Sequence, residues 1–163
     1  MNFNEIFESE ELSSYKPSSD EKWDYRFLEL CKLVSSWSKD PSTKVGAVIV
    51  DQDKRVVSLG YNGFPKGVSD FDSRYDDRNL KYKYVVHAER NAIIFAKTDL
   101  KDCIIYTWPL MPCSACAGII IQSGIKKVIS VVNDNERWNE EFEFSKQMFN
   151  EVGIELELKK RFE

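Results

Sequence analysis

The feature that most constrains the fold is a set of three potential metal ligands that come from two separate segments. His87 stands two residues before Glu89, and further along the chain Pro112 introduces Cys113 and Cys116 in C-x-x-C spacing. Two cysteines three residues apart on a helical turn point the same way, so both thiolates can reach one ion. A catalytic zinc takes three protein ligands and keeps its fourth position for water. The sequence therefore predicts a zinc site of His87, Cys113 and Cys116, and a fold that brings the two segments together.

Glu89 lies beside this predicted site and is not needed as a ligand. Two thiolates and a neutral imidazole cancel the charge of Zn²⁺, so the ion is a weaker Lewis acid than one held by three imidazoles. Zinc can lower the pKa of bound water from about 9 in the aqueous ion to about 7. A nearby base that accepts the proton of this water and later donates it to another atom compensates for the weaker Lewis acidity of the ion. We therefore predict that Glu89 is a general acid and base.

A C-x-x-C pair is also typical of a structural zinc site or a redox pair. A structural site needs a fourth ligand, but the chain has one histidine, and its other cysteines, Cys31 and Cys103, lie far from the motif in sequence. Cys31 sits beside the apolar stripe of a predicted helix and is interpreted as a small core residue. The alternative from a different class is a zinc-stapled interaction module without catalysis, which requires a closed four-ligand site.

The length of 163 residues predicts one domain over residues 18–163, preceded by a polar N-terminal arm over residues 1–17. No run approaches the ~20 apolar residues of a membrane span, and the start of the sequence does not resemble a signal peptide. A cytoplasmic protein is expected, or one in the host-cell cytoplasm if the source is viral. A net charge of −4 and a pI near 5.2 argue against a nucleic-acid partner, because such proteins usually carry a basic face.

Hydrophobic periodicity predicts the order helix, strand, strand, helix, strand, helix, strand, helix, strand. The first helix begins at a capping box, Ser18 to Glu21, and ends at Asp40-Pro41. Its apolar stripe is Trp23, Phe27, Leu30, Val34 and Trp37. The later elements are predicted at 44–50, 55–59, 87–97, 103–107, 113–123, 127–132 and 154–158. A fourth helix is predicted before the last strand, with caps offered by Asn133-Asp134-Asn135, an apolar face of Trp138, Phe142, Phe149 and Val152, and an end at Gly153. Strands joined through helices predict a three-layer α/β/α sandwich with a five-stranded mixed sheet.

The segment from Tyr61 to Tyr84 shows no clean period and is predicted to be an active-site or regulatory loop. Its cations, Arg74, Arg78, Lys81 and Lys83, could clamp phosphate. They sit among several acids, however, and a solvated loop face is the preferred interpretation.

Four stretches together resemble the zinc-dependent cytidine and deoxycytidylate (dCMP) deaminase family, over about residues 23–158. They are residues 38–47 (SKDPSTKVGA), 60–65 (GYNGFP), 81–89 (KYKYVVHAE) and 112–117 (PCSACA). The zinc motif indicates the superfamily, and the first two stretches are similar to its nucleotide-specific branch. The resemblance implies the cytidine-deaminase-like fold and hydrolytic deamination of dCMP to dUMP with release of ammonia, which supplies the precursor of dTMP.

The resemblance also implies site residues. His87, Cys113 and Cys116 bind zinc, and Glu89 shuttles protons. The substrate-binding residues are Asn62 at the sugar, Ser38 and Lys39 at the 5′-phosphate, and Ala88. Two alternatives remain open from the residues themselves, because Asn62-Gly63 is an ordinary turn pair and Lys39 could be a solvated cation at a helix end.

Regulation and assembly are further expectations from the resemblance. The family often forms homo-hexamers that are activated by dCTP and inhibited by dTTP, with Mg²⁺ accompanying the triphosphate. The effector would contact the loop residues Tyr61, Gly63, Phe64 and Lys66. The rival enzymes are deaminases of dCTP, of free cytidine, of another heterocycle or of adenosine in tRNA.

Overall fold

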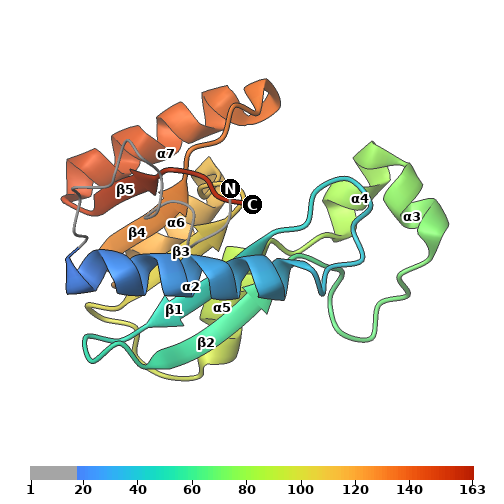
Figure 1. Ribbon diagram of the computed structural model, residues 1–163. Helices are drawn as coiled ribbons and strands as arrows, with labels where there is room; N and C mark the ends of the chain where they lie inside the picture. Colours follow the sequence, from blue (N-terminus) through green and yellow to red (C-terminus); the bar gives the residue numbers. More distant parts are fainter. Residues whose placement is uncertain (1–17) are drawn as a thin grey trace.

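A computed structural model describes residues 18–163, so the predicted arm over residues 1–17 lies outside the described residues. The fold is built on one mixed five-stranded sheet (Figure 1). Its strand order is β2 (Val56–Tyr61), β1 (Gly46–Val50), β3 (Ile104–Trp108), β4 (Lys127–Val131) and β5 (Glu155–Lys159). β1 runs antiparallel to both β2 and β3, whereas β3, β4 and β5 are parallel. The predicted fold class, including the mixed sheet, is confirmed.

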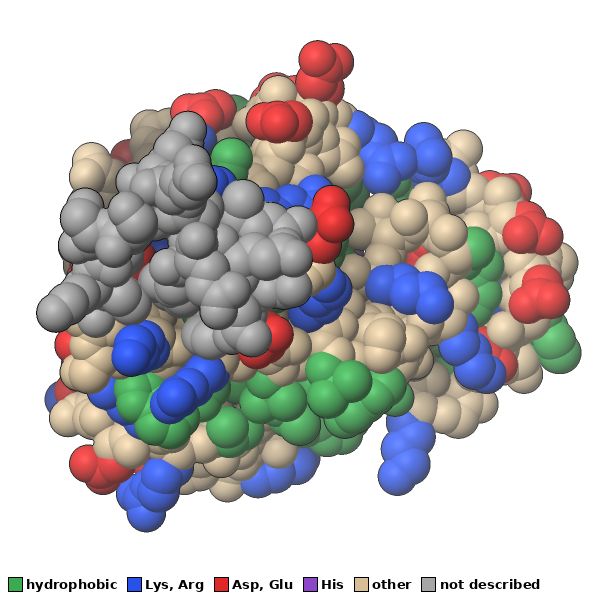
Figure 2. Space-filling model, viewed as in Figure 1, with side chains coloured by type: hydrophobic (Ala, Val, Ile, Leu, Met, Phe, Trp, Pro, Cys, Tyr) green, Lys and Arg blue, Asp and Glu red, His purple; other side chains and the backbone are tan. Residues whose placement is uncertain are grey.

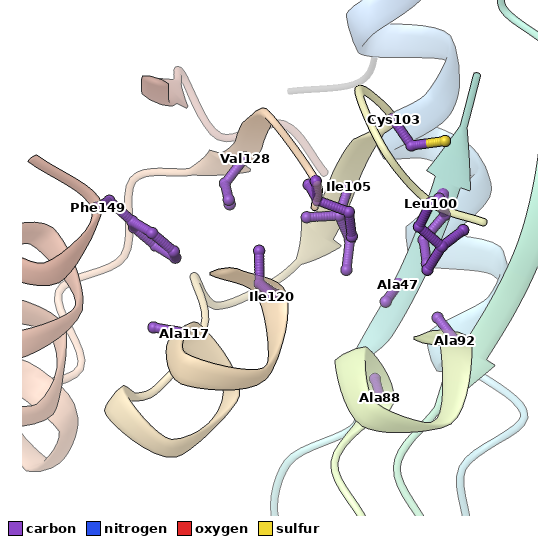
Figure 3. Packing of buried hydrophobic residues seen from close by; sticks show 12 residues of the cluster. Ala47, Ala88, Ala92, Leu100, Cys103, Ile105, Ala117, Ile120, Val128 and Phe149 are labelled. Carbon is purple, nitrogen blue, oxygen red and sulfur yellow. The ribbon is translucent and has the colours of Figure 1, made fainter. Parts of the chain in front are cut away.

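Helices cover both faces of the sheet. One face packs against α2 (Ser19–Ser35), and the other packs against α5 (Ala88–Ala96), α6 (Ser114–Gln122) and α7 (Asn139–Val152). The side chains of β1 alternate between the two layers, as the two-residue period of a strand requires. Val48 belongs to the core cluster of α2, while Ala47 belongs to the cluster that contains α5 and α6 (Figure 3).

Helix α2 begins as predicted, since the Ser18 hydroxyl accepts a hydrogen bond from the backbone N–H of Glu21 at 3.1 Å. The prediction was wrong about its end, because the helix stops at Ser35, before Asp40-Pro41. Of the predicted apolar stripe, Phe27 and Val34 are buried, whereas Trp23 is 37% exposed. Leu28 and Cys31 are fully buried, whereas Trp37 lies beyond the helix and is 51% exposed. The interpretation of Cys31 as a small core residue is confirmed.

The long connection after β2 is not a loop throughout, which corrects the prediction. It contains two short helices, α3 (Asp72–Asp76) and α4 (Arg78–Tyr84), which project from the right-hand side of the molecule in Figure 1. Their only fully buried side chains are Tyr75 and Lys81, which is too few to give an apolar period. The prediction of a solvated face is wrong for Lys81, which pairs with Asp40 in the interior.

The remaining elements lie close to their predicted positions. Helices α6 and α7 end at Gly124 and Gly153, whose positive φ values of 85° and 78° suit glycine. Trp138 belongs to a short 3₁₀ turn, η2 (Glu136–Trp138), rather than to α7. Val152 is 53% exposed, so the buried face of α7 is narrower than predicted. Among residues 18–163, no helix has the length and apolar character needed to cross a membrane.

Candidate metal centre and substrate pocket

The two predicted ligand segments meet at the starts of two helices. His87 is the N-cap residue of α5, Cys113 is the N-cap residue of α6, and Cys116 lies in the first turn of α6. The ligand atoms of all three residues lie within 4.8 Å of one another. The Nδ1 atom of His87 is 3.5 Å from the Sγ atom of Cys113 and 3.4 Å from that of Cys116.

These spacings fit a zinc ion. With Zn–S bonds of about 2.3 Å and Zn–N bonds of about 2.0 Å, a tetrahedral ion separates its sulfur and nitrogen ligands by roughly 3.5 Å, which agrees with the two observed distances. Within the described part of the chain, no further His, Cys, Asp or Glu joins this group. Cys31 and Cys103 are buried in separate core clusters. The geometry therefore favours the open three-ligand site over a closed structural one.

The thiols of the pair differ in their protonation. The hydrogen bond between them lowers the pKa of Cys113 to about 4, and the same hydrogen bond raises the pKa of Cys116. The hydrogen bond therefore favours the thiolate form of Cys113 and the thiol form of Cys116. A divalent cation that displaces the proton of Cys116 gains a second thiolate ligand, because the thiolate is the ligand form of cysteine.

Helix α7 holds the start of α6 in place. The carboxylate of Glu141 accepts hydrogen bonds from the backbone N–H of Ser114, at 3.2 Å, and from the Ser114 hydroxyl. The hydroxyl of Ser145 donates to the carbonyl of Pro112 at 2.8 Å. A carboxylate at a helix start satisfies N–H groups that lack partners within the helix. Helix α7 therefore fixes the position of the P-C-x-x-C segment through hydrogen bonds to Pro112 and Ser114.

Helix α5 is held against β2. The Ser58 hydroxyl donates to the carbonyl of Ala92 at 2.7 Å, and the Asn91 amide donates to the carbonyl of Tyr61 at 2.8 Å. Gly60 allows the close approach, because a Cβ atom there would lie 2.3 Å from the carbonyl oxygen of Ala88. The helix that carries His87 and Glu89 thus lies almost directly on the strand backbone.

Glu89 is the second residue of α5, is 4% exposed and lines a pocket together with His87 and Cys113. Burial raises the pKa of its carboxyl, and the His87 imidazole opposes that shift. A raised pKa favours a group that must accept a proton and keep it for a later step. The position and environment of Glu89 agree with the predicted acid–base role.

The pocket encloses about 600 Å³, including the part that is open to solvent. Its wall is mainly apolar, and its smaller polar part includes the residues of the metal centre. The lining residues beyond His87, Glu89 and Cys113 are Asp40, Thr43, Val45, Asn62, Lys81, Tyr82, Val85, Ala88, Leu110, Met111, Arg137, Trp138 and Phe142. A cavity of this kind, apolar with a few convergent polar groups, is typical of small-molecule sites.

The predicted substrate residues fall into two groups. Asn62 and Ala88 line the pocket. Asn62 is no ordinary turn residue, because its side chain accepts from the backbone N–H of Val45 at 2.8 Å and donates to the carbonyl of Thr43 at 2.9 Å. It thereby shapes one pocket wall.

Ser38 and Lys39 do not line the pocket. The Ser38 hydroxyl is buried and donates to the carbonyl of Asn62 at 2.8 Å. The Lys39 side chain is 69% exposed and pairs with Asp70 at 2.7 Å. Their predicted contact with a phosphate stays a prediction.

The predicted effector residues lie outside this pocket. Tyr61 contacts Trp37 with ring centroids 6.0 Å apart, and Phe64 stacks on Tyr75 at 4.3 Å. Gly63 forms a backbone bridge with Val86, and Lys66 is exposed. Tyr61 is the last residue of β2, and the other three lie at the start of the connection that contains α3 and α4.

Sequence reasoning missed part of the pocket wall. The buried Lys81 pairs there with Asp40 at 3.2 Å, although the two residues are 41 positions apart in sequence. Tyr82, Arg137 and Trp138 line the same region. The one local signal was Asn135, whose side chain caps the turn that carries Arg137; nothing in the sequence linked that turn to the metal centre.

Comparison with known proteins adds independent findings. The family model of the cytidine and deoxycytidylate deaminase zinc-binding region matches residues 21–132. The chain is 48% identical over 138 residues to the uncharacterized deaminase in the luxG 3′ region of Aliivibrio fischeri, and this match covers 83% of the chain and 92% of that protein. It is 38% identical over 150 residues to deoxycytidylate deaminase of Homo sapiens, covering 88% of this chain and 83% of the human one.

A solved structure shares the fold. The dCMP deaminase of cyanophage S-TIM5, crystallised with dCMP and dUMP, superposes with a TM-score of 0.68 and 22% sequence identity. The match covers 88% of this chain and 100% of the phage protein.

Proposed function

Because the chain belongs to the cytidine and deoxycytidylate deaminase family, we propose that it is a hydrolase that converts dCMP to dUMP with release of ammonia. The observation that supports this most strongly is the position of Glu89, buried beside His87 and Cys113 in the wall of one pocket. A carboxylate that is free of the ligand set and faces the substrate space is what a proton-transfer role requires. The names of the human relative and of the phage structure support dCMP as the substrate.

The chemistry divides between a metal and one carboxylate. Zinc held by His87, Cys113 and Cys116 would supply Lewis acidity that makes a water molecule easier to deprotonate. Glu89 accepts the first proton from the water that attacks C4 of cytosine and delivers it to N3. Glu89 then takes the proton of the new C4 hydroxyl and passes it to the amino group, which leaves as ammonia. The apolar wall around Leu110 and Phe142 limits competing water.

Asn62 and Ala88 are the proposed contacts for the inner part of the substrate, since both line the pocket. Asn62 is 6% exposed and holds Val45 in place. The proposed contact at the deoxyribose therefore comes from a side chain whose position is already set before substrate arrives.

Regulation and assembly complete the proposal. We place a dCTP or dTTP effector, with Mg²⁺, near Tyr61, Gly63, Phe64 and Lys66, which all lie outside the substrate pocket. Assembly into a homo-hexamer is supported by exposed apolar side chains, because such side chains can be buried between copies of the chain. Figure 2 shows a band of hydrophobic side chains across the face of the molecule that is in view. Leu33 is 56% exposed and Trp37 is 51% exposed. The four cysteines form no disulfide, which suits a reducing compartment such as the cytoplasm, where dUMP would feed dTMP synthesis.

One assay tests the substrate assignment. Ammonia release is measured with cytidine, CMP, dCMP and dCTP side by side, on zinc-loaded protein. We expect dCMP to give the highest kcat/KM. A higher value for dCTP or cytidine would move the assignment to that substrate, and no turnover with any cytosine compound would favour the non-catalytic zinc module. Addition of dCTP or dTTP with Mg²⁺ should shift the dCMP saturation curve; superimposable curves would remove regulation.

A further inference from the structure

Two buried charged side chains of the pocket wall have no part in the proposed chemistry. Asp40 and Lys81 line the pocket, and their side chains are only 5% and 7% exposed. The ammonium nitrogen of Lys81 lies 3.2 Å from each carboxylate oxygen of Asp40. Charged groups are rarely buried, and replacing both members of a buried pair by uncharged groups of similar volume is often neutral for stability. A buried pair in the wall of a substrate pocket therefore suggests a role beyond holding the fold together.

The Asp40 carboxylate organises the segment that follows α2. Its Oδ1 atom accepts hydrogen bonds from the backbone N–H groups of Ser42 and Thr43, at 2.8 and 3.2 Å. Its Oδ2 atom accepts a longer hydrogen bond, at 3.5 Å, from the side-chain nitrogen of Asn62. The orientation of the carboxylate is therefore fixed, with one oxygen toward the backbone of its own segment and the other toward Asn62.

The side-chain amide of Asn62 takes its orientation from the same segment. Its nitrogen donates to the carbonyl of Thr43 at 2.9 Å as well as to Asp40, and its oxygen accepts from the backbone N–H of Val45 at 2.8 Å. If the amide turned over, its oxygen would face the Asp40 carboxylate and the Thr43 carbonyl. An amide oxygen has two acceptor sites, and among the described residues only Val45 donates to this one. The second site is available to a hydroxyl of the substrate sugar.

We propose that Asp40, held in place by Lys81, is a positioning residue that keeps the oxygen of the Asn62 amide turned toward the sugar of the substrate. This inference rests on the proposed contact between Asn62 and the deoxyribose. The negative charge of Asp40 attracts the N–H side of the amide and repels its oxygen side. The orientation is thereby set before the substrate binds, and a group that is already ordered loses less freedom on binding.

Lys81 supplies the balancing charge from a different part of the chain. It belongs to α4, and its pair with Asp40 joins that helix to a segment 41 residues earlier. Without the ammonium group, the carboxylate would be buried with no counter-ion, which costs free energy. It would then turn toward water and away from Asn62. Helix α4 therefore acts on the substrate pocket through Lys81 and Asp40.

An isosteric double variant separates this role from a purely structural one. Lys81→Met and Asp40→Asn each leave one buried charge without its partner, so each alone should lower the melting temperature. Asp40→Asn/Lys81→Met removes both charges with little change in volume. The new amide at position 40 can still accept from the backbone of Ser42 and Thr43 through its oxygen. Its nitrogen, however, replaces the acceptor that faces Asn62.

The experiment compares both single variants, the double variant, and the double variant in an Asn62→Ala background, all zinc-loaded. Melting temperature, zinc content, kcat and KM for dCMP, and the dissociation constant of dUMP by calorimetry are measured for each. We expect the double variant to recover most of the melting temperature and to keep its zinc. Its kcat/KM for dCMP and its affinity for dUMP should be about 10-fold lower than those of the unsubstituted chain.

The Asn62→Ala background tests whether Asp40 acts through Asn62. There the double substitution should lower kcat/KM by less than about twofold further, because changes that act through one residue are not additive. Asp20→Asn is the matched control. It makes the same change in a long-range ion pair, with Lys54 at 2.8 Å, that is exposed and outside the pocket lining. This control should match the unsubstituted chain in dCMP turnover and dUMP affinity.

Two results would overturn the proposal. One is a double variant that recovers full activity and dUMP affinity together with its stability, as a purely structural pair requires. The other is a further loss of about 10-fold in the Asn62→Ala background, because Asp40 would then act independently of Asn62. If the double variant does not fold, Asp40→Glu replaces it. That variant keeps the charge but moves the carboxylate by one methylene, and unchanged dUMP affinity in it would equally contradict the positioning role.

The binding measurement separates this inference from the proposed function. A chain that binds dUMP, loses that affinity in the double variant and deaminates no cytosine compound would overturn the function and keep the positioning role. A chain that deaminates dCMP equally well with and without the Asp40–Lys81 pair would keep the function and overturn the inference.

Discussion

The two faces of the sheet are packed with different kinds of side chain. Against α2 the core is aromatic: Phe27 lies 5.2 Å from Tyr106, and Trp108 lies 4.7 Å from Phe162, measured between ring centroids. Against α5 and α6 the core combines four alanines, Ala47, Ala88, Ala92 and Ala117, with larger side chains such as Ile105, Ile120 and Phe149 (Figure 3). We call this side of the sheet the small-residue face.

The metal centre lies on the small-residue face, at the starts of α5 and α6. The size of the side chains between a helix and a sheet sets the distance between them, because interiors are close-packed. Large rings fill the space between α2 and β3 and bury much apolar area. At the start of β1, however, Gly46 lets α2 approach the strand, because a Cβ atom there would lie 2.0 Å from the carbonyl oxygen of Cys31. Alanines, together with Gly60, let α5 approach the backbone of β2. The small-residue face is therefore expected to govern activity, and the aromatic face to govern stability.

Gly60→Ala should break the small-residue face and have the largest effect. The added Cβ atom would lie 2.3 Å from the carbonyl oxygen of Ala88 and 2.5 Å from the backbone nitrogen of Ala92, so α5 must shift. We expect a loss of about 3 kcal/mol in the free energy of unfolding, together with loss of zinc and of dCMP turnover. Urea unfolding, zinc content and ammonia release on one preparation check this. A stable variant with full zinc and full activity would contradict the account.

Phe162→Ala should damage the aromatic face instead. Phe162 is 1% exposed and contacts Trp108 and Tyr25. Phe-to-Ala changes in cores cost about 3–5 kcal/mol, and the lower end is expected because the segment after β5 has no regular structure that must be kept. Zinc content and kcat/KM for dCMP, measured at a temperature where the variant is folded, should stay within about twofold, since no substrate or metal contact changes. Loss of zinc would show that the two faces are not separable.

Glu141→Ala should have a smaller effect that is specific to the metal side. Its carboxylate caps α6 through Ser114, next to Cys113. Loss of a helix cap costs about 1 kcal/mol, and loss of an outer support of a metal ligand weakens metal binding by roughly 10-fold or more. Competition with a zinc chelator and thermal unfolding measure the two effects. The matched control is Glu143→Ala on the same helix, because Glu143 is exposed and pairs only with Lys146 among the described residues.

Gly118→Ala should give the smallest effect, with the opposite sign to Gly60→Ala. Gly118 lies in the middle of α6, and a Cβ atom there meets no atom within 4 Å. Alanine restricts the unfolded chain and favours the helix, so we expect a gain of about 0.5–1 kcal/mol. Zinc content and turnover should not change. A destabilised variant would show that the space around α6 is smaller than described.

The sequence predicted the parts of the site that lie within short motifs. His87 and Glu89 are two residues apart, and Cys113 and Cys116 are three apart, so local helical geometry orders each pair before the fold is known. The close packing of the small-residue face is also predictable in principle, because Ala88 and Ala92 are small residues four positions apart on one helix.

The parts that could not be predicted depend on long-range contacts. The pair of Lys81 with Asp40 joins two segments without a shared pattern, and Arg137 reaches the pocket through a short turn. Trp37 continued the helical period by chance after the helix had ended at Ser35. Helix α4 was missed because a charged residue, Lys81, occupies its buried position.

The central claim is that three residues hold the metal while Glu89 moves protons, and Glu89→Gln tests it most directly. The amide keeps the shape of the side chain but cannot accept the proton of the water. The measurement is kcat/KM for dCMP together with zinc content and melting temperature on the same preparation. We predict one zinc per chain, an unchanged fold, and a loss of activity of at least ~10²-fold and up to ~10⁴-fold or more. Retention of more than about a tenth of the activity would contradict the acid–base role, and loss of zinc would show that Glu89 is a ligand.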